Sequence, residues 1–555
     1  MHVADGIGEY LHTQGVDTVF TLLSEDVMDI TSGIQATYDD VEVVECRHEQ
    51  LAIAMADGYA QTTNEVAVAV VGRGPALAQT GTALVTAAKQ DSPLLVVTAE
   101  TPTTATSDLK GFSQQSFLEA TVGDARSVRD TDAVVETLDD AFHDLRAGHG
   151  PIAVQIAWDV IEATVGHGDW PTTPAPGERE RTAAPPLAPD PGHVDALVDA
   201  YLDSGATNPP TILAGRGAYT ANAVDAIETL AERMGAIIAT TLRGQGPFDD
   251  HPYAPGFVGN IGAPLANELV VESDFVLAVG ASLTDYTTDD GHVFADDATI
   301  AHIDADPSHI GKHTPVDVAI PGDARLTVDR FETALAELDV DFSETFWTQN
   351  LRRRIADAPR FPDRDYPQTP GRMDPRDLLP RLDDALPADR NVVVGAGHFA
   401  YWVFDGITVP DPDSLVWPIQ FGSIGLGLPA GIGTALAATD AETTVAFCGD
   451  GGLMMSIQAL ETAVRHDAPL VLVAMNDDAL GAEYAQLHGK GGHTDSGIVP
   501  APDFTAVATA FGAQSHTVTT LDDLDDALDS ISHRPDAPVV LDCKIDREVR
   551  HRRWD

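Results

Sequence analysis

The chain is poor in basic side chains. Its 555 residues include 32 lysines and arginines against 87 aspartates and glutamates, which gives a formal net charge of −55 at pH 7. A field of this sign repels nucleic acid and anionic membranes, so we expect neither as a partner. The acids are scattered, and hydrophobic residues make up an ordinary 43%, which excludes a disordered acidic protein. We therefore predict a folded, halophilic protein whose self-repulsion is screened by concentrated salt.

Cysteines are scarce as well, and long apolar runs are absent. Cys46, Cys448 and Cys543 are too few and too scattered for a disulfide framework or a zinc site, so we expect buried, reduced thiols. The N-terminal segment lacks a basic start followed by an apolar core, and no run of about 18 apolar residues occurs. The expected location is the cytoplasm.

The sequence does contain short apolar runs that alternate with amphipathic segments, which is the pattern of parallel sheets covered by helices. Two proline-rich passages, one from about residue 169 and one that includes "APRFPDRDYPQTPGR", predict linkers. They divide the chain into predicted domains over residues 1–168, 190–336 and 372–555. The predicted fold class is α/β, with three doubly wound domains and mainly parallel sheets.

An aspartate stands between glycines at the end of one predicted strand. "TTVAFC" is followed by "GDGG" and then by a helical pattern, and the N-terminus of that helix is a seat for phosphate. The next strand ends at Asn476, so a right-handed crossover brings Asp450 and Asn476 to neighbouring carboxyl ends, where open α/β sheets bind ligands. Two oxygen ligands beside a phosphate seat suit Mg²⁺. Alternatively, the tripeptide is only a turn in a chain rich in Asp and Gly.

Gly-Asp-Gly followed at this spacing by Asn resembles the thiamine diphosphate motif. The resemblance implies that Asp450, the Asn476 side chain and the main-chain carbonyl of Asp478 bind Mg²⁺ together with the cofactor diphosphate. The motif usually closes with a second Asn, where this chain has Asp477. The glycines of the turn would also bind the cofactor: Gly449, Gly451 and Gly452.

A second candidate site residue is Glu49. It lies where a predicted strand ends and the Ala-rich helix of "RHEQLAIAMADGYA" begins. This segment is similar to the family's glutamate motif, in which a carboxyl group bonded to the aminopyrimidine ring activates the cofactor. Burial would raise the pKa of such a carboxyl. The alternative is a solvated surface glutamate, one of many acids in the chain.

Two further segments resemble cofactor-binding parts of the family. In "QFGSIGLGLPAGIGTAL", Ile424 would hold the cofactor in its bent shape and the carbonyl of Gly422 would accept a bond from its amino group; the glycines could equally serve helix packing. In "VVVGAGHFAYW", the backbone of Gly397, His398 and Phe399 would reach the diphosphate. His398 could equally be a surface histidine.

The resemblance covers almost the whole chain and is closest to acetolactate synthase large subunits and their relatives, benzoylformate decarboxylase and pyruvate oxidase. It implies a pyrimidine-binding domain, a central Rossmann-like domain and a diphosphate-binding domain. In this family Glu49 would serve the metal site of a neighbouring subunit, which implies a homodimer or homotetramer with active sites between subunits.

Departures from the synthase pattern fall where substrates are selected. "FTLLSED" replaces the usual "FGYPGG", "LGAEYAQLHGKGGH" lacks a tryptophan, and the chain stops soon after "VVLDCKID". "SDLKGFSQQSF" occupies the position of a synthase active-site segment, in which Gln114 or Gln115 would contact the substrate. Alternatively, this segment is only an exposed polar loop. "VGNIGAP", "VGASLTD" and "HIDADP" fit a nucleotide pocket, yet relatives without FAD keep the same fold, so the sequence leaves both FAD binding and its absence open.

The predicted function is thiamine diphosphate- and Mg²⁺-dependent decarboxylation of a small-molecule 2-oxo acid with carboligation. The alternative within the family is a decarboxylase that releases an aldehyde. Two alternatives of other classes are a cofactor-binding paralogue without activity and a magnesium-dependent phosphohydrolase. Retention of Glu49, Asp450 and Asn476 together argues against the first, and the second would leave Glu49 and Ile424 without roles.

Overall fold

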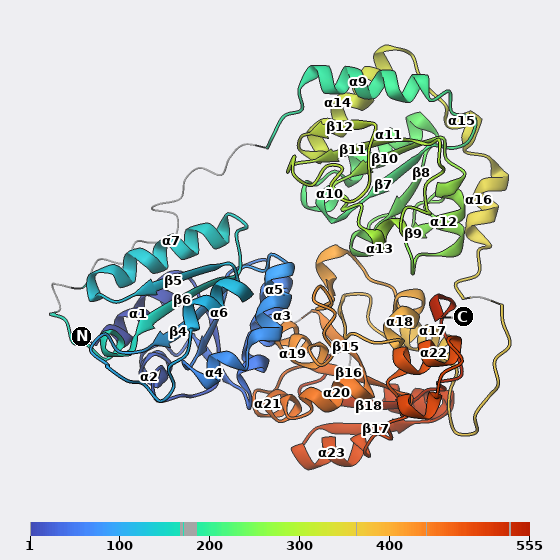
Figure 1. The fold of residues 1–555 in the computed structure, drawn as a ribbon. Helices are drawn as coiled ribbons and strands as arrows, with labels where there is room; N and C mark the ends of the chain where they lie inside the picture. The colour runs from blue at the N-terminus through green and yellow to red at the C-terminus, as the bar shows by residue number, and fades with distance from the viewer. Residues whose placement is uncertain are drawn as a thin grey trace. The chain divides into compact units, whose positions relative to one another are not determined.

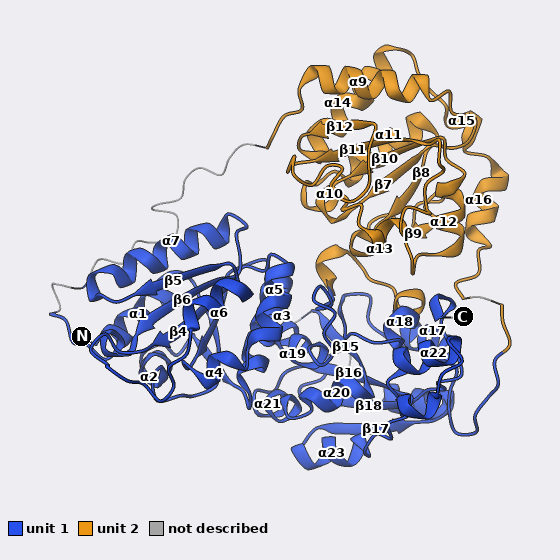
Figure 2. Ribbon diagram, viewed as in Figure 1, with its two compact units in different colours: residues 1–183, 366–403, 416–555 blue, residues 184–365, 404–415 orange. Residues whose placement is uncertain are grey.

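The computed structural model describes residues 2–166, 170, 186–361, 363–439, 441–531 and 534–554. It divides into two compact units (Figure 2). Unit 1 comprises Met1–Ala183, Tyr366–Val403 and Val416–Asp555, and unit 2 comprises Ala184–Asp365 and Phe404–Leu415. Most of the predicted linker from about residue 169 lies outside the described residues.

The first sheet of unit 1 has six strands in the order β2-β1-β3-β4-β6-β5, of which Figure 1 labels β4, β5 and β6. Its strands are β1 Thr18–Thr21, β2 Glu42–Glu45, β3 Ala67–Val71, β4 Leu94–Glu100, β5 Asp124–Val128 and β6 Ile152–Ala157. Its helices are α1 Val3–Thr13, α2 Met28–Thr37, α3 Glu49–Thr63, α4 Pro75–Ala78, α5 Gly81–Lys89, α6 Gln114–Thr121, α7 Val134–Arg146 and α8 Trp158–Ile161.

Both faces of this sheet are buried, which explains its nearly continuous apolar strands. Along β3, Ala67, Ala69 and Val71 pack with α3, α5 and α6, whereas Val68 and Val70 pack with α1, α2 and α7 on the other face. The alternation follows from the period of two along a strand.

The third sheet repeats this strand order, as β14-β13-β15-β16-β18-β17. Its strands are β13 Arg390–Val394, β14 Leu415–Val416, β15 Thr443–Gly449, β16 Leu470–Asn476, β17 Gln514–Val518 and β18 Val539–Lys544. Its helices are α17 Pro375–Ala385, α18 Phe399–Gly406, α19 Gly427–Ala437, α20 Asp450–Ser456, α21 Ala459–Arg465, α22 Gly481–Gly489, α23 Phe504–Phe511 and α24 Leu521–Asp529.

Unit 2 contains the second sheet, in the order β12-β11-β10-β7-β8-β9, which is that of dinucleotide-binding folds. Its strands are β7 Thr211–Ala214, β8 Ile237–Thr240, β9 Gly256–Phe257, β10 Phe275–Val279, β11 Thr299–Asp304 and β12 Val318–Pro321. Its helices are α9 Pro191–Asp203, α10 Arg216–Thr220, α11 Val224–Met234, α12 Pro264–Val271, α13 Asp285–Thr288, α14 Ala324–Glu337, α15 Ser343–Phe346 and α16 Gln349–Ala356.

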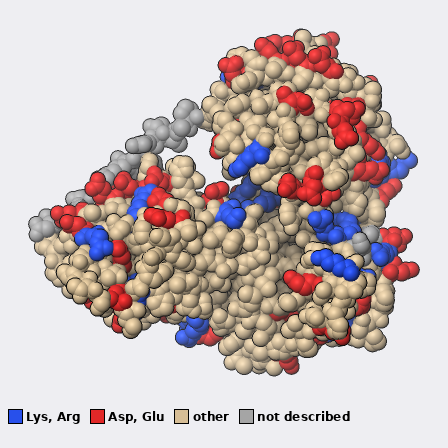
Figure 3. Space-filling view, viewed as in Figure 1, with Lys and Arg blue, Asp and Glu red and all other residues tan. Residues whose placement is uncertain are grey.

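The strand pairings are parallel in all three sheets, for example β15 with β16 and β10 with β11. The predicted fold class is therefore confirmed. The three cysteines are free and buried, as expected. Among the described residues, no helix is both long and apolar enough to cross a membrane. On the face shown in Figure 3, acidic side chains lie in many separate groups.

Helices α3 and α19 pack directly against each other at two glycines. A Cβ at Gly58 would come within 2.2 Å of the Ala430 carbonyl oxygen, and one at Gly433 within 1.8 Å of the Met55 carbonyl oxygen. Later residues of α3 therefore meet earlier residues of α19, and the two helices run antiparallel.

This contact predicts a strong effect of Gly433→Ala. The added methyl group would overlap a backbone oxygen that cannot swing away, so we expect a loss of about 3 kcal/mol in unfolding free energy, at the upper end of overpacking costs. Denaturant unfolding in high salt measures it. Gly489→Ala is the control, because a Cβ there would meet nothing within 4 Å; equal stability of the two variants would contradict the packing.

Candidate active site

Three predicted site segments meet at the carboxyl edge of the third sheet. Strand order reverses between β13 and β15, and such switch points are where open α/β sheets bind ligands. The loop with His398 follows β13, Asp450 follows β15, and Asn476 ends β16. The crossover predicted from the sequence is therefore present.

Asp450 is the first residue of α20 and is 3% exposed. Burial, and then the charge of Asp478, raise its pKa to about 6. Burial and the charge of Asp450 likewise raise the pKa of Asp477. Repulsion between buried carboxylates is relieved by a cation, so this edge of the sheet suits a divalent metal ion.

The orientation of the Asn476 amide is fixed by its surroundings. Its Nδ2 donates to Asp542 Oδ1 at 2.9 Å, and Lys544 Nζ donates to the other oxygen of that carboxylate at 2.7 Å. The oxygen Oδ1 therefore points toward the following loop, where the Asp478 N–H donates to it at 3.3 Å. An amide oxygen turned to this loop is a suitable ligand for Mg²⁺.

The main-chain carbonyl of Asp478 already accepts two hydrogen bonds. Val499 N donates to it at 2.9 Å and Arg547 Nη1 at 3.2 Å. A carbonyl oxygen has two lone pairs, and the contact with Arg547 is the longer of the two hydrogen bonds that occupy them. Asp478 has a left-handed backbone (φ 56°), which places its carbonyl away from the direction of the strand.

The described residues contain no group of three or more His, Cys, Asp or Glu side chains arranged to hold a metal ion. The predicted ligand set does not depend on such a group, because it joins one carboxylate, one amide oxygen and one carbonyl oxygen. Hard oxygen donors of this mixed kind are those Mg²⁺ takes when phosphates complete its shell.

His398 is buried, which excludes the surface-histidine interpretation. Its Nε2 accepts from the His551 backbone N–H at 3.0 Å. Burial, and then the nearby His551 and Arg550, lower its pKa to about 3, so the ring is neutral and its proton is on Nδ1. Phe399 lies against both neighbouring loops: a Cβ at Gly397 or Gly449 would come within 3 Å of its ring.

The segment with Gly422 and Ile424 borders the "GDGG" turn. Gly422 has φ +71°, and a Cβ at Gly452 would lie 3.8 Å from Ile424 Cβ. Large apolar side chains are exposed here: Phe421 is 48% and Met455 55% exposed. The structure therefore brings Ile424 next to the predicted metal and diphosphate turn.

Glu49 is the first residue of α3 and is 9% exposed. Gln79 Nε2 donates to its Oε2 at 3.0 Å. The carboxylate also lies at a helix N-terminus, which favours a negative charge. Glu49 is therefore nearly buried and hydrogen-bonded. It is not a solvated surface glutamate.

Within one chain, Glu49 lies far from Asp450. Arg47 donates to Glu461 at 2.6 and 2.8 Å, and α21, which carries Glu461, leads into the amino end of β16. Asp450 follows the opposite, carboxyl end of β15. Seven strand residues span about 23 Å. The antiparallel packing of α3 on α19 likewise places the start of α3 near the end of α19 that is remote from the "GDGG" turn.

The side chains of Gln114 and Gln115 form hydrogen bonds within the N-terminal domain. Gln114 donates to Ala99 O and Gln155 Oε1 and accepts from the Gly74 N–H. Gln115 donates to Ala125 O and Glu119. Gln114 is buried, which is unlike the exposed loop proposed as its alternative.

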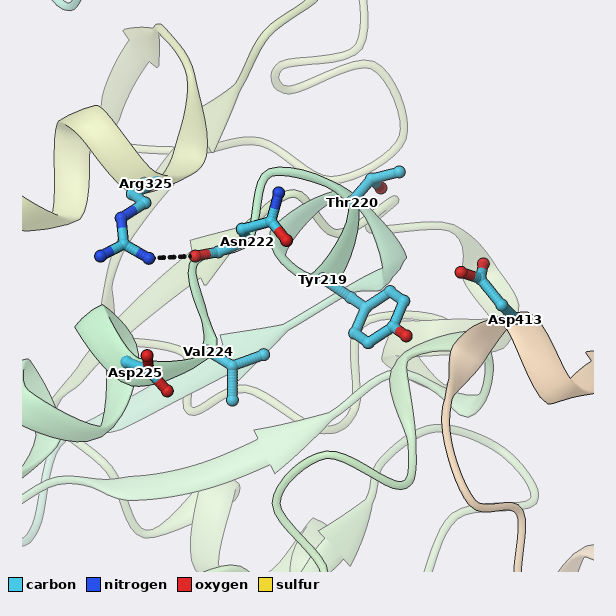
Figure 4. A pocket seen from close by; sticks show the side chains of 7 residues that line it. All are labelled: Tyr219, Thr220, Asn222, Val224, Asp225, Arg325 and Asp413. Carbon is cyan, nitrogen blue, oxygen red and sulfur yellow. Dashed lines mark hydrogen bonds between the residues drawn. The ribbon is translucent and has the colours of Figure 1, made fainter. Parts of the chain in front are cut away.

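Unit 2 has a separate pocket, shown in Figure 4. Arg325 Nη1 donates to the Asn222 carbonyl at 2.6 Å on one side of it. On the other side, burial and the charges of Asp411 and Asp413 raise the pKa of Tyr219. None of the lining residues belongs to the three segments that suggested a nucleotide pocket: they are Tyr219, Thr220, Asn222, Val224, Asp225, Arg325 and Asp413.

Comparison with known families matches all three parts of the chain. Residues 1–122 match "Thiamine pyrophosphate enzyme, N-terminal TPP binding domain", residues 205–331 the central domain, and residues 395–543 the C-terminal TPP binding domain. Together these matches account for most of the chain and follow the order of the sheets. The chain belongs to the thiamine pyrophosphate enzyme family, and it is a thiamine diphosphate-dependent enzyme.

Within that family, the chain is similar to acetolactate synthase large subunits. It is 28% identical over 560 residues to a probable acetolactate synthase large subunit of Methanocaldococcus jannaschii, covering 98% of this chain and 92% of that protein. It is also 28% identical over 554 residues to the isozyme 2 large subunit of Escherichia coli, covering 98% and 96%. The predicted resemblance is therefore confirmed.

A solved structure gives a matching fold. The thiamine diphosphate-dependent 4-hydroxybenzoylformate decarboxylase of Rhodococcus jostii RHA1 aligns with a TM-score of 0.80 at 22% identity, over 98% of this chain and 99% of that one. At this identity the likeness concerns the fold alone.

Four residues of the site region were not predicted from the sequence. Gln79 bonds Glu49, Asp542 orients Asn476, and Arg372 and Arg547 bind the loop after Asn476. None stands in a motif that marks it. Only Asp542 had a signal in the sequence, because it is a polar residue within the apolar run "VVLDCKID".

Proposed function

We propose that the protein catalyses the thiamine diphosphate- and Mg²⁺-dependent decarboxylation of a 2-oxo acid, followed by carboligation, as acetolactate synthases do. The observation that carries the proposal is the meeting of Asp450 and the fixed Asn476 amide at neighbouring strand ends beside a helix N-terminus. The similarity to synthase large subunits over nearly the whole chain supports it.

Asp450, Asn476 and the Asp478 carbonyl would hold Mg²⁺. The backbone of the "GDGG" turn and of the loop at His398 would hold the diphosphate, and Ile424 would support the ring system. Thiamine diphosphate, when bound, supplies a carbon nucleophile and an electron sink for decarboxylation. Glu49 would hold a proton at the aminopyrimidine nitrogen, and the apolar wall around Ile424 would exclude water from the reacting carbon.

We further propose that each site is completed by Glu49 of a second copy, in a homodimer or homotetramer. Glu49 cannot reach Asp450 of its own chain, because the two lie at opposite ends of the third sheet. Exposed apolar side chains near the site, Phe421, Met454 and Met455, would be covered by that second copy.

Simple decarboxylation to an aldehyde is the second candidate. It is favoured by the segment from α22, Gly481–Gly489, onward. This segment follows Asn476 and lacks the tryptophan that synthases carry there. The two candidates share every step up to the loss of carbon dioxide. They differ only in the product that is formed afterwards, an acetohydroxy acid or an aldehyde.

A product assay separates the candidates. Purified protein in high salt, given thiamine diphosphate, Mg²⁺ and a panel of 2-oxo acids, is expected to form an acetohydroxy acid. Mass spectrometry of the products is the measurement, and omission of the cofactor is the control. An aldehyde alone would favour the second candidate, and no carbon dioxide from any 2-oxo acid would contradict the proposal.

A further inference from the structure

The loop of residues 476–478, here called the metal loop, is bound by two arginines from distant parts of the chain. Arg372 Nη1 donates to Asn476 O at 2.9 Å, and its Nη2 is paired with the Asp478 carboxylate. Arg547 Nη1 donates to Asp477 O at 2.7 Å and to Asp478 O at 3.2 Å. All three successive carbonyl groups of the loop therefore accept from a guanidinium group.

Such a loop needs external support. It leaves the strand ladder at Asn476 and turns through the left-handed conformation of Asp478, which a non-glycine residue adopts at some cost in free energy. It also carries the buried carboxyl group of Asp477, next to the buried carboxyl group of Asp450. The planar fork of a guanidinium group can bridge two acceptors in a fixed geometry, which the ammonium group of lysine cannot do.

We propose that Arg372 and Arg547 are positioning residues that hold the metal loop in the conformation that presents the Asn476 side chain and the Asp478 carbonyl to a divalent cation. The inference rests on the proposed function, since it concerns the same metal site. Neither arginine would touch the substrate. Their effect is on the geometry of the ligands, as for the outer partners of other metal sites.

The rival interpretation assigns the opposite role to Arg547. Its contact with Asp478 O at 3.2 Å could hold the place of the cation, so that metal must displace the guanidinium group. A positioning residue raises metal affinity, whereas a competitor lowers it. The sign of the change in metal affinity after substitution therefore decides between the two roles.

The experiment measures Mn²⁺ binding by electron paramagnetic resonance, in high salt with thiamine diphosphate, for the full chain and the variants Arg372→Lys and Arg547→Lys. The matched control is Arg390→Lys. Arg390, which is buried, likewise donates to carbonyl groups, those of Asp383, Leu386 and Pro387, but it starts β13 at the opposite edge of the sheet.

Each site variant is expected to bind Mn²⁺ at least about tenfold more weakly, while Arg390→Lys keeps the wild-type affinity. Thermal unfolding of each apo variant identifies any that fails to fold, and the other site variant then carries the test. Unchanged affinity in the folded variants, or tighter binding by Arg547→Lys, would overturn the inference alone. Absence of Mn²⁺ binding by the wild-type chain would overturn the proposed function and the inference with it.

Discussion

Glu49→Gln is expected to lower the release of carbon dioxide from a 2-oxo acid by about 10²- to 10⁴-fold, the usual contribution of a positioned acid or base. The amide keeps the shape of the side chain and can still accept the bond from Gln79, so the fold should persist. It cannot carry the proton that the aminopyrimidine nitrogen requires. Binding of thiamine diphosphate with Mg²⁺ should therefore stay close to that of the wild type.

Carbon dioxide release and cofactor binding by calorimetry are measured side by side. Glu45→Gln is the control, since Glu45 lies on the preceding strand and is partly exposed. Near-normal turnover of Glu49→Gln would show that the carboxyl group has no part in activation.

Asp450→Ala is expected to weaken Mg²⁺-dependent binding of thiamine diphosphate by at least about 10²-fold. The carboxylate is the one charged ligand in the proposed set, and its removal leaves only neutral oxygens to hold the metal. Calorimetric titration with and without Mg²⁺ measures the loss. Asp529→Ala, at an exposed position at the end of α24, is the control; unchanged affinity of Asp450→Ala would contradict the ligand assignment.

The apo form of the same variant should not be less stable at neutral pH. The pKa of Asp450 is raised to about 6 in the folded protein, above its ordinary value near 4. The folded state therefore holds the proton more tightly, so the stability that this group contributes is present at low pH and is lost as the pH rises through about 6. Above that pH its removal relieves repulsion, and a fall in the apo unfolding temperature would contradict this account.

Mixing the two inactive variants tests where Glu49 acts. If Glu49 serves the neighbouring subunit, a dimer with one Glu49→Gln chain and one Asp450→Ala chain contains one intact site. Random exchange of subunits would then restore about one quarter of wild-type activity. If both residues acted within one chain, every site would remain defective and no activity would return.

Most strands could be predicted from the sequence because they lie inside their sheets. Their two faces are both buried, so runs such as those of β3, β4 and β15 are mostly apolar. Four strands at sheet edges are short or largely exposed and give a weaker signal: β5, β9, β12 and β17. β5 and β17 are largely exposed and polar, so hydrophobic patterning does not distinguish them from loops.

The sequence by itself determined the fold class, the cofactor family and the short-range parts of the site. Asp450 and Asn476 could be brought together because a parallel crossover has a fixed hand and returns each strand end to the same edge. That rule depends only on the local order of strand, helix and strand, which apolar periodicity reveals.

Only the tertiary structure decided how the loop after Asn476 is held and how far Glu49 lies from Asp450 within one chain. Arg372 and Asn476 are 104 residues apart, and Gln79 and Glu49 are 30 apart, so no periodic pattern links them. The separation of Glu49 from Asp450 follows from the packing of α3 on α19 and the ion pair of Arg47 with Glu461. Such contacts join side chains whose distance along the chain carries no information about their distance in space, so they become known only when the chain has folded.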